Sequence, residues 1–375
     1  MTHPRRRVLL LSDDDVVTGT LRRLTRIGEH LTAEADVVMA TLAGQVAAGP
    51  QEPRFPLQRI ASHHSLNADP EIWERDYLMP RLDRLMSGFT PDVLVVDGDL
   101  PSRLLERLDR AHPTVHVRLT SAAEVPIGGK LTARSTPTPV ILGEITEDGA
   151  QSAATTAPLL DAAVRGATGG GLTAGSEPGE TRAPTVVLDL PGLSPDTTAA
   201  VEDAALEFFA SRRPEWRVAL LDSAVARRTA PGVERISGGA TAELVSRTVG
   251  ALAVPGHRAM HTWTPARIPT LWLTEGPGSE RPIRGAAERP RRRLRPDQQE
   301  ALRRRAARCA EAGWGHHAEL DGPQDMDALR SRLTEALELM DGRGWVPSGL
   351  ARMPEDGAEQ AAQAILRVVS APAPA

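Results

Sequence analysis

The sequence predicts an α/β protein of two domains, each built on a mostly parallel sheet covered by helices. Two observations support this. Apolar, strand-like segments alternate with helix-like segments along most of the chain, and the alternation is interrupted at residues 165–184. Because parallel neighbours need a crossover connection, usually a helix, repeated strand–helix units imply parallel sheets with helices on both faces. The length of 375 residues also exceeds that of one ordinary domain.

The first half supplies the elements of an N-terminal domain, expected over residues 1–164. Short apolar runs predict strands at 7–12, 35–42, 56–62, 92–99, 114–119 and 138–145, and amphipathic patterns predict helices at 19–32, 71–89 and 102–111. In an open parallel sheet of this kind, ligands bind beyond the carboxyl ends of the strands.

Residues 165–184 are rich in Gly, Ser, Thr and Pro, a composition typical of a flexible linker. A C-terminal domain is expected over 185–345. Its strands are predicted at 185–192, 216–224, 232–238, 249–256, 268–275 and 315–320, and its helices at 197–213, 297–313 and 326–340. The remaining residues, 346–375, hold an amphipathic helix at 357–369 and a short tail, and we expect this helix to pack back on the first domain.

Composition favours a cytoplasmic protein and argues against several classes of function. A net charge of −5 does not suit a general nucleic-acid binder, which needs surplus basic residues to neutralise phosphates. The single cysteine, Cys309, cannot form an internal disulfide, and no Cys/His group has zinc-site spacing. We expect no signal peptide and no membrane span. Lys130 is the single lysine among many arginines, a bias typical of high-GC bacterial genes.

Two polar groups follow strands of the first domain and are candidates for a general base. Asp13, Asp14 and Asp15 come directly after the first strand, where a carboxylate could take a proton from an acceptor hydroxyl. The alternative is that one of them caps the next helix and the others face solvent. His63 and His64 follow the third strand and could serve as the base instead, because histidine titrates near neutral pH; the alternative is a pair of solvated loop histidines.

Asp97 and Asp99 form an Asp-x-Asp pattern at the end of the fourth strand. Two carboxylates at this spacing can chelate a hard divalent cation. The two-domain order does not fit the fold that uses this pattern for metal binding, so we predict no metal site.

Residues 254–273, "VPGHRAMHTWTPARIPTLWL", contain a helix start at Gly256 followed by Pro269 before the next strand, and Gln298 and Gln299 open a later helix. These two features, the C-terminal helix and the order of two α/β domains together resemble the GT-B fold of nucleotide-sugar glycosyltransferases. In that fold, two Rossmann-like domains flank a cleft. The second half is similar to the bacterial N-acetylglucosaminyltransferase family that makes lipid II. The resemblance covers the entire chain loosely and residues 232–340 more specifically.

The resemblance implies a donor site in the C-terminal domain. Gly192 and Ser194 would lie where the first turn of this domain contacts phosphate. Gly256 opens the helix that faces the donor, and Thr262 stands where the family has a ribose-binding Glu. In the family, the Gln298 and Gln299 positions contact the donor sugar.

Three basic side chains follow Gly256. His257, Arg258 and His261 lie at the start of the same helix, where Arg258 could pair with a diphosphate; the alternative is an ordinary solvated helix start. In the first domain, Gly19 and Thr20 stand where the family has a Gly-His pair, so the resemblance does not supply the family's catalytic histidine.

The function predicted on this basis is transfer of a sugar from a nucleotide-activated donor, UDP- or dTDP-linked, to an unidentified acceptor, without a metal or a permanently bound cofactor. The substitutions at Thr20 and Thr262 favour an alternative, a catalytically inactive partner or scaffold subunit. A nucleotide-sugar epimerase is a further alternative. The arginines from Arg281 to Arg308 could contact an anionic membrane surface, which would make the protein peripheral at the inner membrane, a phosphorylated acceptor, or an acidic protein. The alternative is a loop followed by a solvated helix face.

Overall fold

A computed structural model describes two compact units. Unit 1 comprises residues 1–46, 51–159 and 355–375, and unit 2 comprises residues 47–50 and 160–354. The residues described are 5–13, 20–42, 53–98, 100, 104, 108, 115–121, 138–143, 155–158, 183–221, 231–237, 239–276, 296–321, 326–341 and 357–370. Within these ranges, no helix combines the length and the apolar character that crossing a membrane requires.

Unit 1 is built on a sheet in the order β3-β2-β1-β4-β5-β6-β7, in which neighbouring strands pair in parallel. The strands are β1 (Arg6–Ser12), β2 (Ala35–Thr41), β3 (Leu57–Arg59), β4 (Val93–Asp97), β5 (Val115–Ser121), β6 (Thr138–Gly143) and β7 (Thr155–Pro158). Successive side chains of a strand point to opposite faces, so Val8 and Leu10 enter one core cluster while Leu9 and Leu11 enter the other. Both faces of this sheet are therefore buried, as a parallel sheet requires.

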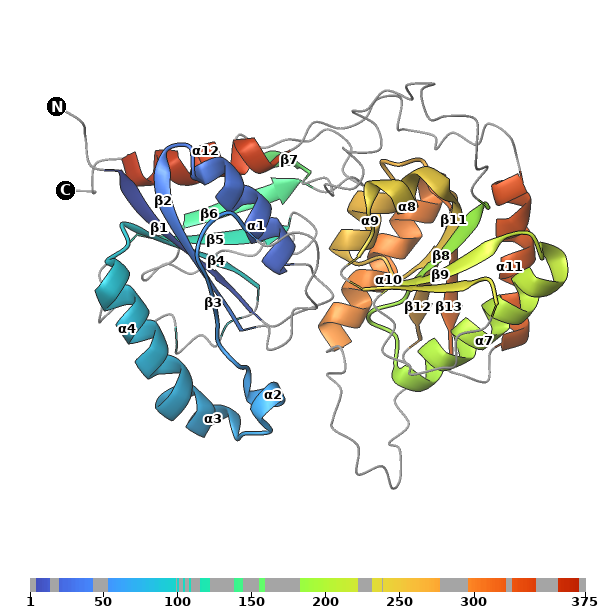
Figure 1. The fold of residues 1–375 in the computed structure, drawn as a ribbon, viewed down its shortest axis with the longest axis horizontal. Coiled ribbons are helices and arrows are strands. Elements are labelled where there is room, and N and C mark those ends of the chain that lie inside the picture. Colours follow the sequence, from blue (N-terminus) through green and yellow to red (C-terminus); the bar gives the residue numbers. More distant parts are fainter. Residues whose placement is uncertain are drawn as a thin grey trace. The chain divides into compact units, whose positions relative to one another are not determined.

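The C-terminal helix α12 (Gly357–Ser370) completes the core of unit 1. It lies beside α1 (Thr20–Leu31) and β7 (Figure 1). Ala358, Ala361 and Ile365 are fully buried in the same cluster as Val8 and Leu10. Full burial of a side chain of the size of Ile365 contributes roughly 1.5–3 kcal/mol to stability, so residues distant in sequence hold this face of the sheet together.

The segment predicted as one helix at 71–89 is divided by a π-helical turn. The short helix α3 (Pro70–Trp73) leads into the π-helix η1 (Glu74–Leu78), and α4 (Met79–Phe89) follows. Pro80 has no N–H to donate to the carbonyl four residues earlier, and its ring would collide with that carbonyl in a regular α-helix. The N–H of Met79 instead bonds to the carbonyl of Glu74, five residues back, which widens the helix there.

Unit 2 repeats the architecture with a sheet in the order β10-β9-β8-β11-β12-β13, again paired in parallel. Its strands are β8 (Thr185–Asp189), β9 (Arg217–Leu221), β10 (Val233–Ile236), β11 (Thr248–Ala253), β12 (Thr270–Glu275) and β13 (His316–Leu320). Its helices are α7 (Pro195–Arg212), α8 (Ala242–Arg247), α9 (His257–Trp263), α10 (Pro296–Glu311) and α11 (Met326–Asp341). Figure 1 shows α7 and α11 side by side.

Both sheets have a point where the strand order reverses. The chain moves outward from β1 to β3 and then returns to place β4 on the other side of β1, and it does the same around β8 and β11. Such a reversal leaves a crevice beyond the carboxyl ends of the two strands, where open α/β sheets bind their ligands. The predicted α/β class, with two mostly parallel sheets covered by helices, is confirmed. The ends of β1/β4 and β8/β11 are the candidate ligand sites.

Candidate active site

A buried carboxylate ends β8 at the reversal point of unit 2. Asp189 is 1% exposed, and its two oxygens accept from the guanidinium of Arg258 and from the indole Nε1 of Trp263, the latter at 3.1 Å. Both donors come from α9, which follows β11. This carboxylate therefore connects α9 to the end of β8. Asp189 was not among the residues predicted from the sequence.

Arg258, predicted to pair with a diphosphate, is thus held within the protein by Asp189. Its side chain is 10% exposed. A guanidinium presents its N–H groups in a planar fork suited to anions. Arg258 therefore has the chemistry to contact an anion beside Asp189, but its charge is already partly balanced by that carboxylate.

The first turn of unit 2 holds Gly192 and Ser194, which the resemblance placed at the donor phosphate. Gly192 has φ of +112°, a conformation that glycine adopts without strain. Ser194 caps α7, with its hydroxyl accepting from the N–H of Thr197 at 3.3 Å. The N–H of Ser194 donates to a carboxylate oxygen of Glu275, at 3.0 Å. Glu275 ends β12 and is 8% exposed, so an internal carboxylate lies on the amide predicted to contact phosphate.

The helix α9 places the other predicted donor residues. Gly256 is its N-cap. Thr262 is 1% exposed, and its hydroxyl donates to the carbonyl of Arg258 at 2.8 Å, within the helix. His261 is 2% exposed. The hydroxyl of Thr262 therefore donates its proton to a hydrogen bond within α9. The side chain of His257 lies outside the described part of the structure.

The glutamine pair lies in the first turn of α10, where Gln299 is half-buried; the side chain of Gln298 is not described. Further along this helix, Arg303 donates to Glu300 and, at 3.2 Å, to the backbone carbonyl of Glu275. Arg305 is 5% exposed, whereas Arg304 and Arg308 of the same helix are exposed, so the described part of the predicted arginine surface, Arg281 to Arg308, is only partly buried. The arginines before α10 lie outside the described residues.

In unit 1, Asp13 lies at the reversal point between β1 and β4. It is 4% exposed, and it accepts from the hydroxyl of Thr20 at 2.9 Å. Gly98, just after β4, has φ of +98°, and a Cβ at this position would overlap the Asp13 carboxylate. Asp13 therefore needs glycine at position 98 in order to lie at the end of β1. Asp14 and Asp15 lie outside the described residues.

Asp97 has a structural partner. Its two carboxylate oxygens accept from Nε and Nη2 of Arg23, at 2.9 and 2.7 Å, and both side chains are almost fully buried. This bidentate pair connects α1 to the end of β4 and directs both oxygens to a cation of the protein itself. Asp99 lies outside the described residues.

The predicted histidines begin a short helix, α2 (His63–Leu66), where the sequence analysis expected a loop after the third strand. The ring of His63 is half-buried and lies 5.4 Å from the ring of Trp73, in a tilted arrangement. His63 thus packs on α3, in the segment that follows the edge strand β3, and not at the reversal point. The side chain of His64 is not described.

No family model and no curated protein matches this chain, but solved structures match it over nearly its full length. Spinosyn rhamnosyltransferase SpnG in complex with thymidine diphosphate is 15% identical, with a TM-score of 0.54 over 97% of this chain and 96% of that chain. Glycosyltransferase VinC in complex with dTDP is 14% identical, with a TM-score of 0.51 over 97% and 95%. A putative UDP-N-acetylglucosamine 2-epimerase from Listeria monocytogenes is 10% identical, with a TM-score of 0.54 over 97% and 95%.

At these identities the similarity shows the fold. The chain has the GT-B fold of nucleotide-sugar glycosyltransferases, with one Rossmann-like sheet in each unit, as the resemblance implied.

Proposed function

We propose that the protein is a nucleotide-sugar-dependent glycosyltransferase whose donor site lies at the β8/β11 reversal of unit 2. The observation that carries the proposal is the strand order of this unit, which brings the Gly192–Ser194 turn and the Arg258–Asp189 pair to the carboxyl ends of β8 and β11. Two solved structures of the same fold hold thymidine diphosphate (dTDP), which supports a nucleoside diphosphate as the leaving group. We favour a dTDP-linked donor over a UDP-linked one.

In the proposed reaction, residues of unit 2 act on the donor, and Asp13 of unit 1 is the candidate base. The acceptor hydroxyl oxygen forms a bond to the anomeric carbon of the sugar, the bond from that carbon to the diphosphate oxygen breaks, and its electron pair leaves with the nucleotide. The N–H of Ser194 and the guanidinium of Arg258 would stabilise the charge on the leaving diphosphate. Asp13, at the β1/β4 reversal, would take the proton of the acceptor hydroxyl.

An inactive partner or scaffold subunit is the main alternative, and three contacts favour it. Arg258 is paired with Asp189, the Ser194 amide is occupied by Glu275, and the hydroxyl of Thr262 bonds within α9. A protein of this kind would bind a nucleotide weakly or not at all.

An epimerase is the second alternative, supported by the matching fold of a putative UDP-N-acetylglucosamine 2-epimerase. An epimerase would convert a nucleotide sugar in the absence of any acceptor. The more specific similarity to the lipid II-forming family stays a prediction, as do the contacts with an anionic membrane or an acidic protein.

A thermal-shift screen against UDP, GDP, dTDP, CDP and their sugars tests the proposal. A ligand that binds only the folded state stabilises it by about 2.7 kcal/mol at a hundred times its Kd, so dTDP or a dTDP-sugar should raise the midpoint most. Absence of a shift with every nucleotide at millimolar concentration would contradict the proposal. Conversion of a nucleotide sugar without an acceptor, followed by NMR, would favour the epimerase.

A pair of variants at Ser194 isolates the backbone amide. Ser194 has φ of −59°, which proline can adopt, so Ser194→Pro removes the N–H while Ser194→Ala keeps it. Both variants lose the capping hydroxyl equally. We expect the nucleotide-induced shift to survive in Ser194→Ala and to be lost in Ser194→Pro; equal shifts in both would place the diphosphate elsewhere.

A further inference from the structure

The helix α4 has two faces with different surroundings. Met79, Leu82 and Met86 are buried in the core beneath the sheet of unit 1. A second face carries Arg81, Arg84, Leu85, Gly88 and Phe89, which fall on one side of the helix because they are spaced three and four residues apart. Together with Gln58 of the edge strand β3, these residues line a pocket of about 490 Å³. This volume is within the range of small-molecule sites.

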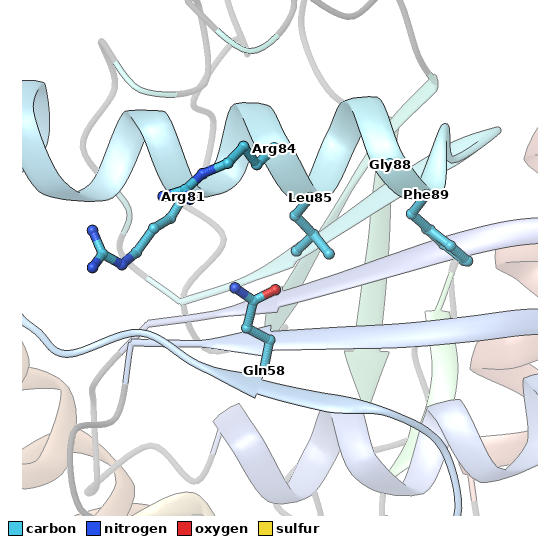
Figure 2. A pocket seen from close by; sticks show the side chains of 6 residues that line it. All are labelled: Gln58, Arg81, Arg84, Leu85, Gly88 and Phe89. Carbon is cyan, nitrogen blue, oxygen red and sulfur yellow. The ribbon is translucent and has the colours of Figure 1, made fainter.

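The pocket combines apolar walls with two cations. Leu85 and Phe89 are half-buried; Figure 2 shows Leu85 and Gln58 pointing toward one another, with Phe89 on one side of them and the side chains of Arg81 and Arg84 on the other. The Arg81 guanidinium lies 3.5 Å from the centre of the Tyr77 ring and donates to the Tyr77 carbonyl at 3.0 Å. These two contacts to the preceding π-helical turn fix Arg81 in one arrangement before any ligand binds.

The two arginines have no carboxylate partner in the part of the chain that the structure describes. Arg84 bonds to the carbonyl of Pro80 at 3.1 Å, and Arg81 bonds to the carbonyl of Tyr77. Neither forms an ion pair with a described residue, whereas the neighbouring Arg75 pairs with Asp76. Two adjacent guanidinium groups repel one another, and each retains N–H donors suited to a carboxylate or phosphate.

Gly88 keeps the pocket open. A Cβ built at this position meets no atom within 4 Å, so a larger side chain would occupy the pocket without displacing the protein. Glycine inside a helix is less favourable than alanine, and nothing in the backbone at Gly88 requires it. The absence of a side chain at Gly88 leaves this part of the pocket open.

We infer that this pocket is an accessory binding site for a soluble organic anion, a phosphate or carboxylate joined to an aromatic or short aliphatic body. The anion would bind Arg81 and Arg84, and the apolar body would pack on Leu85 and Phe89 over Gly88. The site lies between α4 and the edge strand β3, apart from the β1/β4 reversal. It therefore does not include Asp13, and it does not depend on the proposed function.

The test uses the full chain and phenyl phosphate as the probe, followed by ligand-observed NMR titration at millimolar concentrations. We expect saturable binding, with benzyl alcohol and inorganic phosphate each weaker by about tenfold or more, because each lacks one half of the recognised chemistry. The double variant Arg81→Gln/Arg84→Gln should weaken phenyl phosphate by about tenfold or more. Gly88→Leu should abolish binding.

Matched controls separate this pocket from general charge effects. Arg75→Gln/Arg367→Gln removes two exposed arginines of the same unit, and Gly88→Ala adds only a methyl group; both should bind the probe nearly as the wild type does. Thermal unfolding followed by circular dichroism checks that each variant folds. The arginine variants test the anion contact and the Gly88 variants test the open space of the pocket, so the two sets are independent tests.

Several results would overturn the inference. The first is no saturable binding of phenyl phosphate, or equal binding of it by the wild type and by both pocket variants. The second is displacement of the probe by dTDP, which would assign it to the nucleotide site. The third is binding to phosphatidate-containing vesicles without binding of the soluble probe, which would make the surface a lipid headgroup contact.

Discussion

At the scale of single residues, the proposed donor site is held together by carboxylates that already have partners. Asp189 is shared between Arg258 and Trp263, and Glu275 accepts from the Ser194 amide. A nucleoside diphosphate would have to share Arg258 and displace Glu275. The two carboxylates therefore set how strongly this site can bind an anion, and they distinguish a working donor site from an inactive one.

Removing Arg258 alone should destabilise the protein. Arg258→Met leaves the carboxylate of Asp189 buried with only Trp263 as its described side-chain donor, and breaking a buried pair in this way costs about 3–5 kcal/mol. Chemical denaturation would measure the loss. The same change at Arg330, whose partners Glu207 and Asp327 are both largely exposed, should have little effect.

The double variant Arg258→Met/Asp189→Leu completes the test. Because it removes both charges, we expect it to regain much of the stability that Arg258→Met loses. Additive losses would show that the two side chains do not interact in solution. An alanine substitution at Arg258 is for the same reason a poor probe of ligand binding, since lost stability and lost contact would be confounded.

Two glycines should respond in opposite ways to alanine. Gly98→Ala should destabilise unit 1 by about 1–3 kcal/mol, because φ is +98° and the new Cβ would overlap Asp13. Gly88→Ala meets open space and should stabilise α4 by up to about 1 kcal/mol. Midpoints of thermal unfolding measure both, and a neutral Gly98→Ala would mean that the end of β1 is arranged differently.

At the scale of elements, the edge strand β13 should make stability depend on pH. The Nε2 of His317 lies 2.9 Å from the hydroxyl of Thr274 on β12. Burial, and secondarily the nearby Arg332, lower the pKa of His317 below its usual value of 6.5. The unfolded chain then binds the proton more readily than the folded one.

The free energy of unfolding should therefore be highest above the usual histidine pKa and fall as the pH drops through 6.5 toward the lower pKa of the folded state. Denaturation midpoints between acidic and neutral pH would show this slope. His317→Gln should reduce it, while His316→Gln, the neighbour on the same strand, should leave it in place. An unchanged slope in His317→Gln would assign the pH dependence to other groups.

Local patterns in the sequence predict most of the helices and strands. Where a prediction of an element was wrong, the cause lies in a few neighbouring residues. The helices at 19–32 and 357–369 match α1 and α12 to within a residue or so at each end, because their apolar residues repeat at helical spacing. The break before α4 was missed because the periodicity continues through Pro80, although a proline at this point was the available signal. His63 was expected in a loop and lies in α2.

At the scale of the whole molecule, the two-domain α/β class follows from the alternation of elements, but the site does not. Asp189 and Arg258 are 69 positions apart, and Ser194 and Glu275 are 81 positions apart. Neither pair is visible in a motif, since only the strand order brings the partners together. The sequence predicts the Gly192–Ser194 turn after β8 as a candidate site, whereas it gives no sign of the internal carboxylates Asp189 and Glu275 that the structure brings to this turn.

The central claim is that unit 2 binds a nucleoside diphosphate against the Ser194 amide, where Glu275 now lies. Isothermal titration of dTDP into wild type, Glu275→Gln and the control Glu300→Gln tests it most directly. Gln keeps an oxygen for the amide but removes the charge that opposes the diphosphate, so we expect Glu275→Gln to bind about tenfold more tightly and Glu300→Gln to match the wild type. Equal affinity in all three proteins, or no binding by wild type and Glu275→Gln, would contradict the account.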